Sequence, residues 1–320
     1  MKFIKRFLIG SVIVVPMLLA GAVVFGTTAA PPRLGAINDA IAKLDMVGLP
    51  AASTFQARDG ARITYRTYQG DPKLGVLLIH GSTARSESLN ELAKHLAGFT
   101  SKPTVYTIDI RGHGLSGTAG DIGYIGQLEH DIEDFLKDRA AFHSDVLWRL
   151  AGFSAGGGFA LRVAGSPVGE SFEKIVLISP MLDPRGPTYR PDGGGWAAPY
   201  IPRIVALSVL GRLGITTFHG LPAIAFAKRD DGSFPTYSYR LLTNFGVGSD
   251  WATYLKASKT TPHVLIGEKD ELFVASAYEP MLKPVRPEIR VDVVSGLGHM
   301  DMTLKQPALD FVAKALGLAE

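Results

Sequence analysis

The segment 152–156, with the sequence Gly-Phe-Ser-Ala-Gly, constrains the fold of this chain more than any other, because of its neighbours. The apolar run 146–151 before it predicts a buried strand, and the small residues of 157–164 predict the start of a helix. A turn that joins strand to helix this tightly leaves no space for side chains at 152 and 156, so glycine is needed there. The turn would hold Ser154 in a strained backbone conformation, with its hydroxyl raised above the edge of a sheet.

A serine hydroxyl attacks a carbonyl only when a base accepts its proton and a third group orients that base. Both kinds of group follow later strand candidates. The strand candidate 261–267 leads into Asp270, and the strand candidate 289–294 leads into His299. Since the carboxyl ends of parallel strands lie at the same edge of a sheet, the sequence predicts Ser154 as nucleophile, Asp270 as acid and His299 as base.

The acid has one alternative. Asp183 lies beyond the strand candidate 174–179 and would place a carboxylate at the same edge of the sheet. The base has none, since no histidine other than His299 follows the acid. Two upstream histidines, His80 and His113, lie in loops near the predicted site, where we expect them to brace the backbone.

A second apolar run, 75–79, predicts a strand buried on both faces, and it ends at His80-Gly81-Ser82-Thr83. The Ser82 N–H is expected to donate to an oxyanion. The Ala155 N–H would donate beside it from a helix N-terminus, where partial positive charge accumulates. Removing one such donor typically costs about 3–4 kcal/mol of transition-state stabilisation, so both residues are predicted members of the site.

Five motifs follow one another in the chain: His80-Gly81, Asp109-Ile110-Arg111-Gly112-His113-Gly114, Gly152-Phe153-Ser154-Ala155-Gly156-Gly157, Gly267-Glu268-Lys269-Asp270 and Gly298-His299. Together they resemble the α/β-hydrolases of the serine-aminopeptidase-like, monoacylglycerol-lipase or lysophospholipase-like branch. The resemblance covers residues 55–318 and implies an α/β-hydrolase fold, with a mostly parallel, doubly wound sheet and an inserted lid or cap. It implies serine hydrolysis and does not identify the substrate.

The N-terminus carries a segment of a different kind. Residues 1–6 are basic, and residues 7–25 contain no charge over a length that suits a bilayer core. We expect an N-terminal transmembrane helix with the catalytic domain on the non-cytoplasmic side, because the basic flank stays in the cytoplasm. The alternative is a signal peptide cleaved at Ala20-Gly21-Ala22, which would give a secreted or periplasmic protein. Residues 1–30 thus form the predicted anchor and linker.

The hydrolase domain is predicted to span residues 51–320. Strand candidates alternate with helices, from an edge antiparallel strand at 62–68 to a closing helix at 302–318. Between about residues 181 and 249 this alternation stops, and prolines and a run of three glycines mark an insertion. We expect the insertion to cover the serine as a cap. Its apolar residues would line a pocket for an acyl chain or pack the cap's own core.

The composition of the chain excludes several classes of function and several kinds of site. With 320 residues, 46% of them hydrophobic, the chain is long enough for one sizeable core. A net charge of +3 without a long basic block gives no indication of nucleic-acid binding. The absence of cysteine excludes disulfides, thiolate metal sites and a cysteine nucleophile. No spacing of His, Asp and Glu resembles a metal site, and no cofactor is predicted.

These observations predict a serine hydrolase that cleaves a carboxylic ester with a lipid-like or other apolar acyl group, through an acyl-enzyme intermediate. Two alternatives stay open. An aminopeptidase would use the same catalytic residues and would need acidic side chains in the cap to bind a free amine, for which Asp192, Asp230 and Asp231 are candidates. A non-catalytic, membrane-tethered binding module would keep the fold without turnover.

Overall fold

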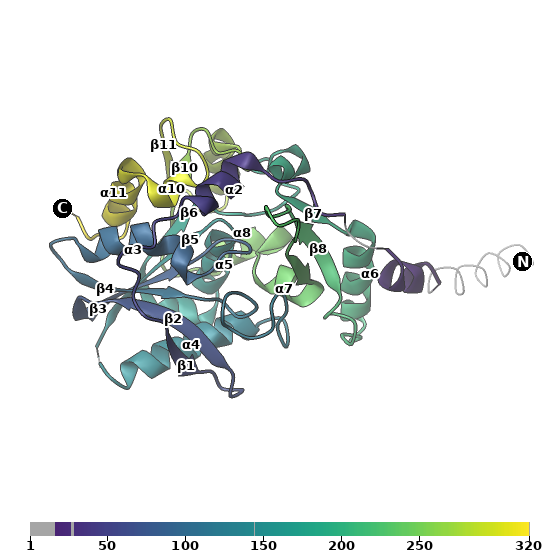
Figure 1. Ribbon diagram of the computed structural model, residues 1–320, viewed down its shortest axis with the longest axis horizontal. Coiled ribbons are helices and arrows are strands. Elements are labelled where there is room, and N and C mark those ends of the chain that lie inside the picture. The colour runs from purple at the N-terminus through teal and green to yellow at the C-terminus, as the bar shows by residue number, and fades with distance from the viewer. Residues whose placement is uncertain (1–16, 27–28, 144, 320) are drawn as a thin grey trace, which may run out of the picture.

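The computed structural model describes residues 17–26, 29–143 and 145–319 (Figure 1). Eight strands form the main sheet in the order β1-β2-β4-β3-β5-β6-β10-β11. Strand β2 is antiparallel to both of its neighbours, and every other neighbouring pair is parallel. The strands of this sheet are β1 Ser53–Gln56, β2 Arg62–Tyr68, β3 Asp71–Ile79, β4 Pro103–Ile108, β5 Leu147–Phe153, β6 Phe172–Ile178, β10 His263–Gly267 and β11 Arg290–Val294.

Helices cover both faces of the main sheet (Figure 1). On one face, α3, α10 and α11 contribute to one apolar core. On the other face, α4, α5, α8 and α9 contribute to a second core. The helices of the core are α3 Asn90–Ala97, α4 Gln127–Ala140, α5 Ala155–Ala164, α8 Trp251–Ala257, α9 Tyr278–Leu282, α10 Asp301–Leu304 and α11 Gln306–Ala315, and α2 Gly35–Ala42 precedes the sheet.

The central strands are apolar along their whole inner length because both of their faces are covered. In β3, Val76 and Leu78 join the core under α3 and α11, whereas Leu77 and Ile79 join the core on the α5 side. All four side chains are fully buried. A strand with alternate residues buried on opposite faces needs a continuous apolar run, which is the pattern that predicted it.

Two predicted elements differ in the structure. The strand at 62–68 was expected at the edge of the sheet, but β1 pairs outside it, so β2 lies one position inward. The closing helix predicted at 302–318 is two helices, α10 and α11, which are separated at Lys305 by extended backbone. Pro307 follows in the first turn of α11, where proline needs no N–H partner and favours a helix start.

Between β6 and β10 the chain leaves the alternating pattern. A separate antiparallel sheet has the order β7-β8-β9, and two further helices flank it (Figure 1). We refer to residues 181–249 as the cap. Its elements are β7 Ala197–Pro199, α6 Ile201–Arg212, β8 Pro222–Phe226, β9 Thr236–Ser238 and α7 Tyr239–Asn244.

The N-terminal segment meets the cap. Residues 17–24 are helical, and Val23 is buried against Ala206 and Leu207 of α6. Most of the predicted membrane span, 7–16, lies outside the described residues. Within the part of the chain that the structure describes, no helix combines the length and the apolar character needed to cross a bilayer. The transmembrane helix therefore stays a prediction.

Candidate active site

Ser154 lies at the apex of the turn between β5 and α5. Its φ of 57° is in the left-handed region, which is costly for a residue with a side chain and indicates that the surrounding turn fixes it. The flanking glycines are required by close backbone approach. A Cβ on Gly152 would collide with the carbonyl of Gly156, and a Cβ on Gly156 would collide with the carbonyl of His80. The sequence predicted both collisions.

The imidazole of His299 links the two other predicted residues. Its Nε2 lies 3.1 Å from the Ser154 Oγ, and its Nδ1 lies 2.8 Å from the Asp270 Oδ2. Because the carboxylate can only accept, Nδ1 carries the proton and Nε2 is free to accept the serine proton. Asp270 and His299 are fully enclosed and Ser154 is 8% exposed, so the three groups meet in a site that is largely shielded from water.

Asp270 is held as a carboxylate. Its Oδ1 accepts the N–H groups of Leu272 and Phe273, each at 2.9 Å. Burial acts to raise the pKa of Asp270, but His299 and these two N–H groups outweigh it, so its pKa falls below the usual range. The alternative acid, Asp183, instead accepts the N–H of Arg185 at 3.0 Å. The structure thus brings Asp270, and not Asp183, to His299.

Glu271 also contributes to the site, and sequence reasoning missed it. Its carboxylate accepts the backbone N–H of His299 at 2.7 Å and so fixes the loop that carries the imidazole. The ring of His299 also contacts the rings of Phe153 and Phe273, with centroids 4.8 and 5.3 Å away. The only available signal was the position of Glu271 directly after the predicted acid, which does not by itself indicate a bond across to another loop.

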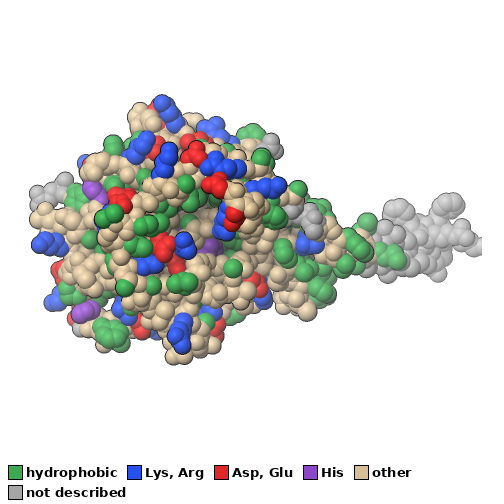
Figure 2. Space-filling view, in the orientation of Figure 1, with side chains coloured by type: hydrophobic (Ala, Val, Ile, Leu, Met, Phe, Trp, Pro, Cys, Tyr) green, Lys and Arg blue, Asp and Glu red, His purple; other side chains and the backbone are tan. Residues whose placement is uncertain are grey.

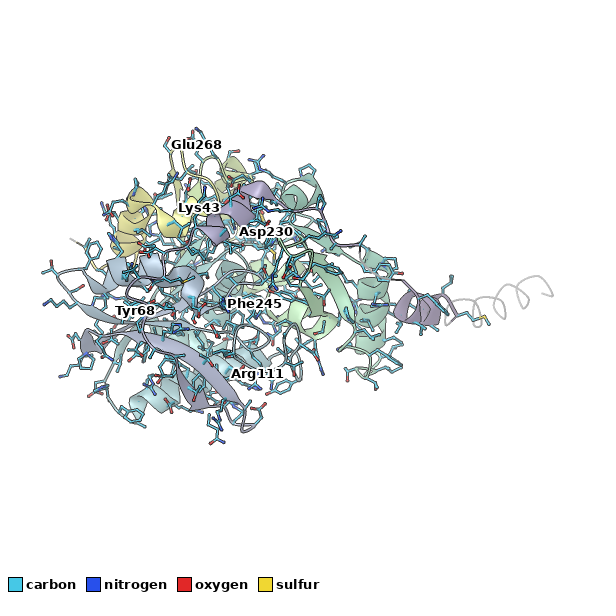
Figure 3. The ribbon with its side chains drawn as sticks, viewed as in Figure 1. Lys43, Tyr68, Arg111, Asp230, Phe245 and Glu268 are labelled. Atoms are coloured by element: carbon cyan, nitrogen blue, oxygen red, sulfur yellow. The ribbon has the colours of Figure 1, made fainter. Side chains whose placement is uncertain are left out.

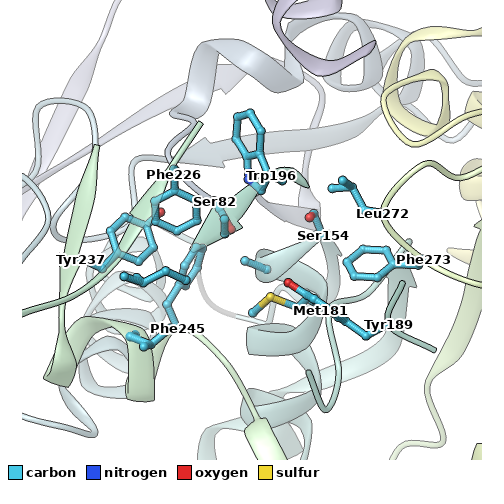
Figure 4. A pocket seen from close by; sticks show the side chains of 14 residues that line it. Ser82, Ser154, Met181, Tyr189, Trp196, Phe226, Tyr237, Phe245, Leu272 and Phe273 are labelled. Atoms are coloured by element: carbon cyan, nitrogen blue, oxygen red, sulfur yellow. The ribbon is translucent and has the colours of Figure 1, made fainter. Parts of the chain in front are cut away.

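The two predicted oxyanion residues, Ser82 and Ala155, line a cavity together with Ser154 (Figure 4). Within the described residues, neither the Ser82 N–H nor the Ala155 N–H donates to another protein group. The next N–H, that of Thr83, is already occupied, since it donates to the Tyr237 hydroxyl from the cap. The N–H groups of Ser82 and Ala155 thus remain available to an oxyanion beside Ser154.

His80 and His113 brace the loops beside the site, as the sequence predicted. His80 Nδ1 lies 2.8 Å from the Gly81 carbonyl, and its Nε2 accepts the Ile110 N–H at 3.2 Å. His113 Nδ1 lies 3.2 Å from the Ile110 carbonyl. Burial lowers the pKa of both rings, and burial together with the neighbouring His80 lowers the pKa of His113 to about 3. Both are therefore neutral structural groups at physiological pH.

The turn 109–114 is fixed by buried charge. Asp109 accepts the N–H groups of Ser86 and Leu115, and so ties this turn to the segment that follows the oxyanion loop. The guanidinium of Arg111, which Figure 3 labels, pairs with Asp59 at 2.8 Å and with Asp131 at 2.7 Å. These bonds anchor the turn 109–114 to α4 and to the turn between β1 and β2, which gives it a positioning role.

The cavity beside Ser154 is almost entirely apolar. Its lining combines loops of the core with the cap, and no acidic side chain contributes to it (Figure 4). Its volume of about 30 Å³ holds only two or so water molecules, so an acyl chain enters only if the lining moves. The lining residues are Ser82, Ser154, Ala155, Met181, Tyr189, Trp196, Ala197, Ile224, Phe226, Tyr237, Leu242, Phe245, Leu272 and Phe273.

The acidic residues considered for binding a free amine lie elsewhere. Asp230 pairs with Arg33 at 2.5 Å, with its own side chain 68% exposed. Asp231 accepts the N–H of Ser233 in an exposed turn. The side chain of Asp192 lies outside the described residues. Among the described residues, no group of three or more His, Asp or Glu side chains could hold a metal ion.

A parallel sheet with a serine at a strand–helix turn, facing a histidine on a later loop, defines the α/β-hydrolases. The chain belongs to the serine aminopeptidase, S33, family, whose profile matches residues 70–303. It is thus a serine hydrolase of the α/β-hydrolase superfamily. No curated protein matches the sequence.

Several solved structures share the fold at low sequence identity. A soluble variant of monoglyceride lipase from Saccharomyces cerevisiae has a TM-score of 0.62 and 16% identity, over 86% of this chain and 96% of that one. A membrane phospholipase A, described as a bacterial virulence factor, has a TM-score of 0.57 and 17% identity, over 98% and 99%. The thioesterase domain from the curacin biosynthetic pathway has a TM-score of 0.54 and 16% identity, over 83% and 98%.

Proposed function

We propose that this protein hydrolyses carboxylic esters with apolar acyl groups, with Ser154 as nucleophile, His299 as base and Asp270 as the group that orients the base. The observation that carries the proposal is the bridging position of the imidazole, 3.1 Å from the serine oxygen and 2.8 Å from the carboxylate. These distances are within the reach that proton transfer requires.

In the proposed reaction, His299 Nε2 accepts the hydroxyl proton while the Ser154 Oγ bonds to the ester carbonyl carbon. The carbonyl oxygen becomes an oxyanion and accepts the N–H groups of Ser82 and Ala155. Collapse of this intermediate breaks the ester C–O bond, and the leaving alcohol takes the proton from Nε2. A water molecule then repeats the sequence on the acyl-enzyme and releases the acid. Asp270, with its lowered pKa, remains ionised throughout and stabilises the imidazolium.

The cavity supports an apolar acyl group. Aromatic and aliphatic side chains make up most of the lining around Ser154. An aminopeptidase would need a carboxylate here to bind the substrate's free amine, and the cavity lining contains none. The monoglyceride lipase and the phospholipase A among the structural relatives are named for lipid esters, which agrees with this choice.

A location at a membrane is the second part of the proposal. The outer face of α6 carries Ile201, Val205 and Val209, spaced four residues apart and exposed. The exposed Val24 and Phe25 of the N-terminal segment lie close to this helix, since Val23 packs against it. Figure 2 shows hydrophobic side chains gathered at this end of the molecule. Residues 193–229 contain no acidic residue, which favours contact with an anionic lipid surface.

Arg203 joins the cap to the N-terminal segment at this point. Its guanidinium donates to the carbonyls of Val23 and Gly26, at 3.0 and 2.8 Å, and also to the Pro222 carbonyl. A cation at the carbonyl end of the 17–24 helix suits the helix dipole. An anchor that continues from this helix would hold the cap next to the bilayer. Carbonate extraction of membranes, with N-terminal sequencing of the full-length product, tests this, since a cleaved signal peptide would leave a shortened and soluble chain.

The hydrolase proposal is tested by a substrate series. The full-length protein is assayed with p-nitrophenyl esters from acetate to dodecanoate, beside leucine p-nitroanilide, and is treated with a fluorophosphonate probe. We expect labelling at Ser154, turnover of the esters with a preference for medium or longer chains, and no turnover of the anilide. Anilide turnover above ester turnover would favour the aminopeptidase, and the absence of both labelling and turnover would favour a binding module.

A further inference from the structure

A polar side chain of the cap, that of Tyr237, reaches the loop that carries Ser82. The hydroxyl of Tyr237, on β9, lies 2.5 Å from the Thr83 nitrogen and 2.5 Å from His113 Nε2. Its ring is 4% exposed and packs against Phe226, with centroids 4.6 Å apart (Figure 4). Thr83 directly follows Ser82, so this contact joins the cap to the loop that carries one of the two oxyanion donors.

The direction of each hydrogen bond follows from the groups around His113. Its Nδ1 faces the carbonyls of Ile110 and Arg111, which only accept, so Nδ1 carries the proton. The ring is neutral, since burial and His80 lower its pKa to about 3, and Nε2 is therefore an acceptor. The Tyr237 O–H donates to Nε2, and the Tyr237 oxygen accepts the Thr83 N–H. Burial also raises the pKa of Tyr237, which keeps this hydroxyl protonated.

The backbone of Thr83 needs this support. Its φ of 59° lies in the left-handed region, which a β-branched residue adopts only when its surroundings determine it. The adjacent turn bond, from the Ala84 N–H to the Gly81 carbonyl, is long at 3.3 Å. The bond to Tyr237 is the shorter of the two. The peptide unit between Ser82 and Thr83 is therefore oriented from the cap.

We propose that Tyr237 is a positioning residue for ester hydrolysis: by accepting the Thr83 N–H, its hydroxyl holds the oxyanion loop so that the Ser82 N–H faces the reacting carbonyl. This inference rests on the proposed function. It means that the oxyanion site is complete only while β9 is seated on the loop. A cap displaced to admit an acyl chain must return before the transition state forms.

Tyr237→Phe removes the hydroxyl and keeps the ring. The matched control is Tyr239→Phe, which makes the same change two residues away, where the ring lies against His219 and outside this network. We expect Tyr237→Phe to lower kcat on p-nitrophenyl butyrate by about 10- to 100-fold, with KM changed less than threefold. Full removal of an oxyanion donor costs about 10²–10³, and here the donor is displaced and not deleted. We expect Tyr239→Phe to stay within twofold of the wild type.

A merely structural role is separated by a trifluoromethyl ketone inhibitor, whose hemiketal oxyanion needs the same donors. If Tyr237 positions the loop, the affinity of Tyr237→Phe for the trifluoromethyl ketone falls by the same factor as its kcat/KM. Its affinity for an uncharged amide analogue of the ester stays constant. Equal loss of both, or kcat within threefold of the wild type, overturns the proposal. A wild type that hydrolyses no ester would instead contradict the proposed function.

One measurement is independent of activity and of the variant's folding. In the wild-type protein, residue-resolved amide exchange should show the Thr83 N–H strongly protected and the Ser82 N–H exchanging at least tenfold faster, because only the former donates within the protein. In folded Tyr237→Phe the protection of Thr83 should fall at least tenfold. Equal exchange at both residues in the wild type would contradict the bond on which the inference depends.

Discussion

The two sides of the cavity are built on different principles. On the core side, Ser154, Asp270 and His299 lie beyond the ends of three strands of one sheet and are joined by short polar contacts, and strained backbone fixes Ser154. On the cap side, the lining consists mainly of aromatic and aliphatic side chains, and the hydroxyl of Tyr237 reaches the loop that carries Ser82. Proton transfer requires that the reacting groups be displaced only slightly, whereas binding of an apolar acyl chain requires only sufficient space. We therefore expect sharp losses from core substitutions and graded changes from cap substitutions.

The largest effect is expected for Ser154→Ala. Without the nucleophile no acyl-enzyme forms, and kcat on p-nitrophenyl butyrate should fall by a factor on the order of 10⁶. The control is Ser166→Ala, a residue beyond the opposite end of α5 whose hydroxyl donates to the Val163 carbonyl. We expect this variant to keep activity within twofold. If Ser154→Ala kept more than one per cent of wild-type turnover, Ser154 would not be the nucleophile. The proposed difference between the core side and the cap side would then also be wrong.

Asp270→Asn should follow, with a loss on the order of 10⁴ in kcat, because an amide cannot hold His299 in the tautomer that accepts the serine proton. Asp183→Asn is the matched control, since Asp183 was the alternative acid and lies in a turn with Arg185. We expect it to stay within twofold of the wild type. The reverse order of effects would transfer the orienting role to Asp183.

The core side of the site could be predicted from the sequence because short local motifs specify its catalytic residues. A strand, a glycine-flanked serine and a helix specify the turn at Ser154 without knowledge of any distant segment. Glu271 could not be found in this way. Its function depends on the distance between two loops, and a glutamate in a turn after a strand is most often solvated.

The cap could be predicted only as an interruption. Prolines and glycines marked where strands and helices stop alternating, but nothing local announced a second sheet, because its strands are only three to five residues long. Short strands carry too few residues for periodicity to indicate them. Tyr237 could not be predicted from local sequence, because its partners Thr83 and His113 lie more than 120 residues earlier.

An effect of intermediate size is expected in the pH dependence of stability. It arises from His113, which lies in a core loop and bonds to Tyr237 of the cap. The pKa of His113 is about 3 in the folded protein against an ordinary value near 6.5, so the unfolded state binds the proton more readily. Its contribution to stability is complete above pH 6.5 and is lost as the pH falls from 6.5 toward 3. The free energy of unfolding should drop by about 1.4 kcal/mol per pH unit for this group. His80 acts in the same direction.

Urea unfolding between pH 7.5 and 5 measures this slope. We expect it to flatten by about one proton in His113→Asn and to be unchanged in the exposed control His143→Gln. Asp270 also loses stability in acid, but its lowered pKa places that loss below pH 4 and outside the measured interval. Identical slopes in the wild type and His113→Asn would show that the histidine is not buried in its neutral form.

The smallest effect should come from the cap's apolar lining. Ile224→Val removes one methylene from the cavity wall, at a cost in stability of about 0.5–1.5 kcal/mol. Because the closed cavity of about 30 Å³ limits the acyl chain, the added space should favour longer esters. We expect the ratio of kcat/KM for octanoate over butyrate to rise about threefold. Val209→Ala, on the exposed face of α6, should leave that ratio unchanged. A loss of all activity in Ile224→Val would mean that the cap, like the core, must be positioned precisely for catalysis. A cap that only provides space for the acyl chain could not stop the reaction when the cavity becomes slightly larger.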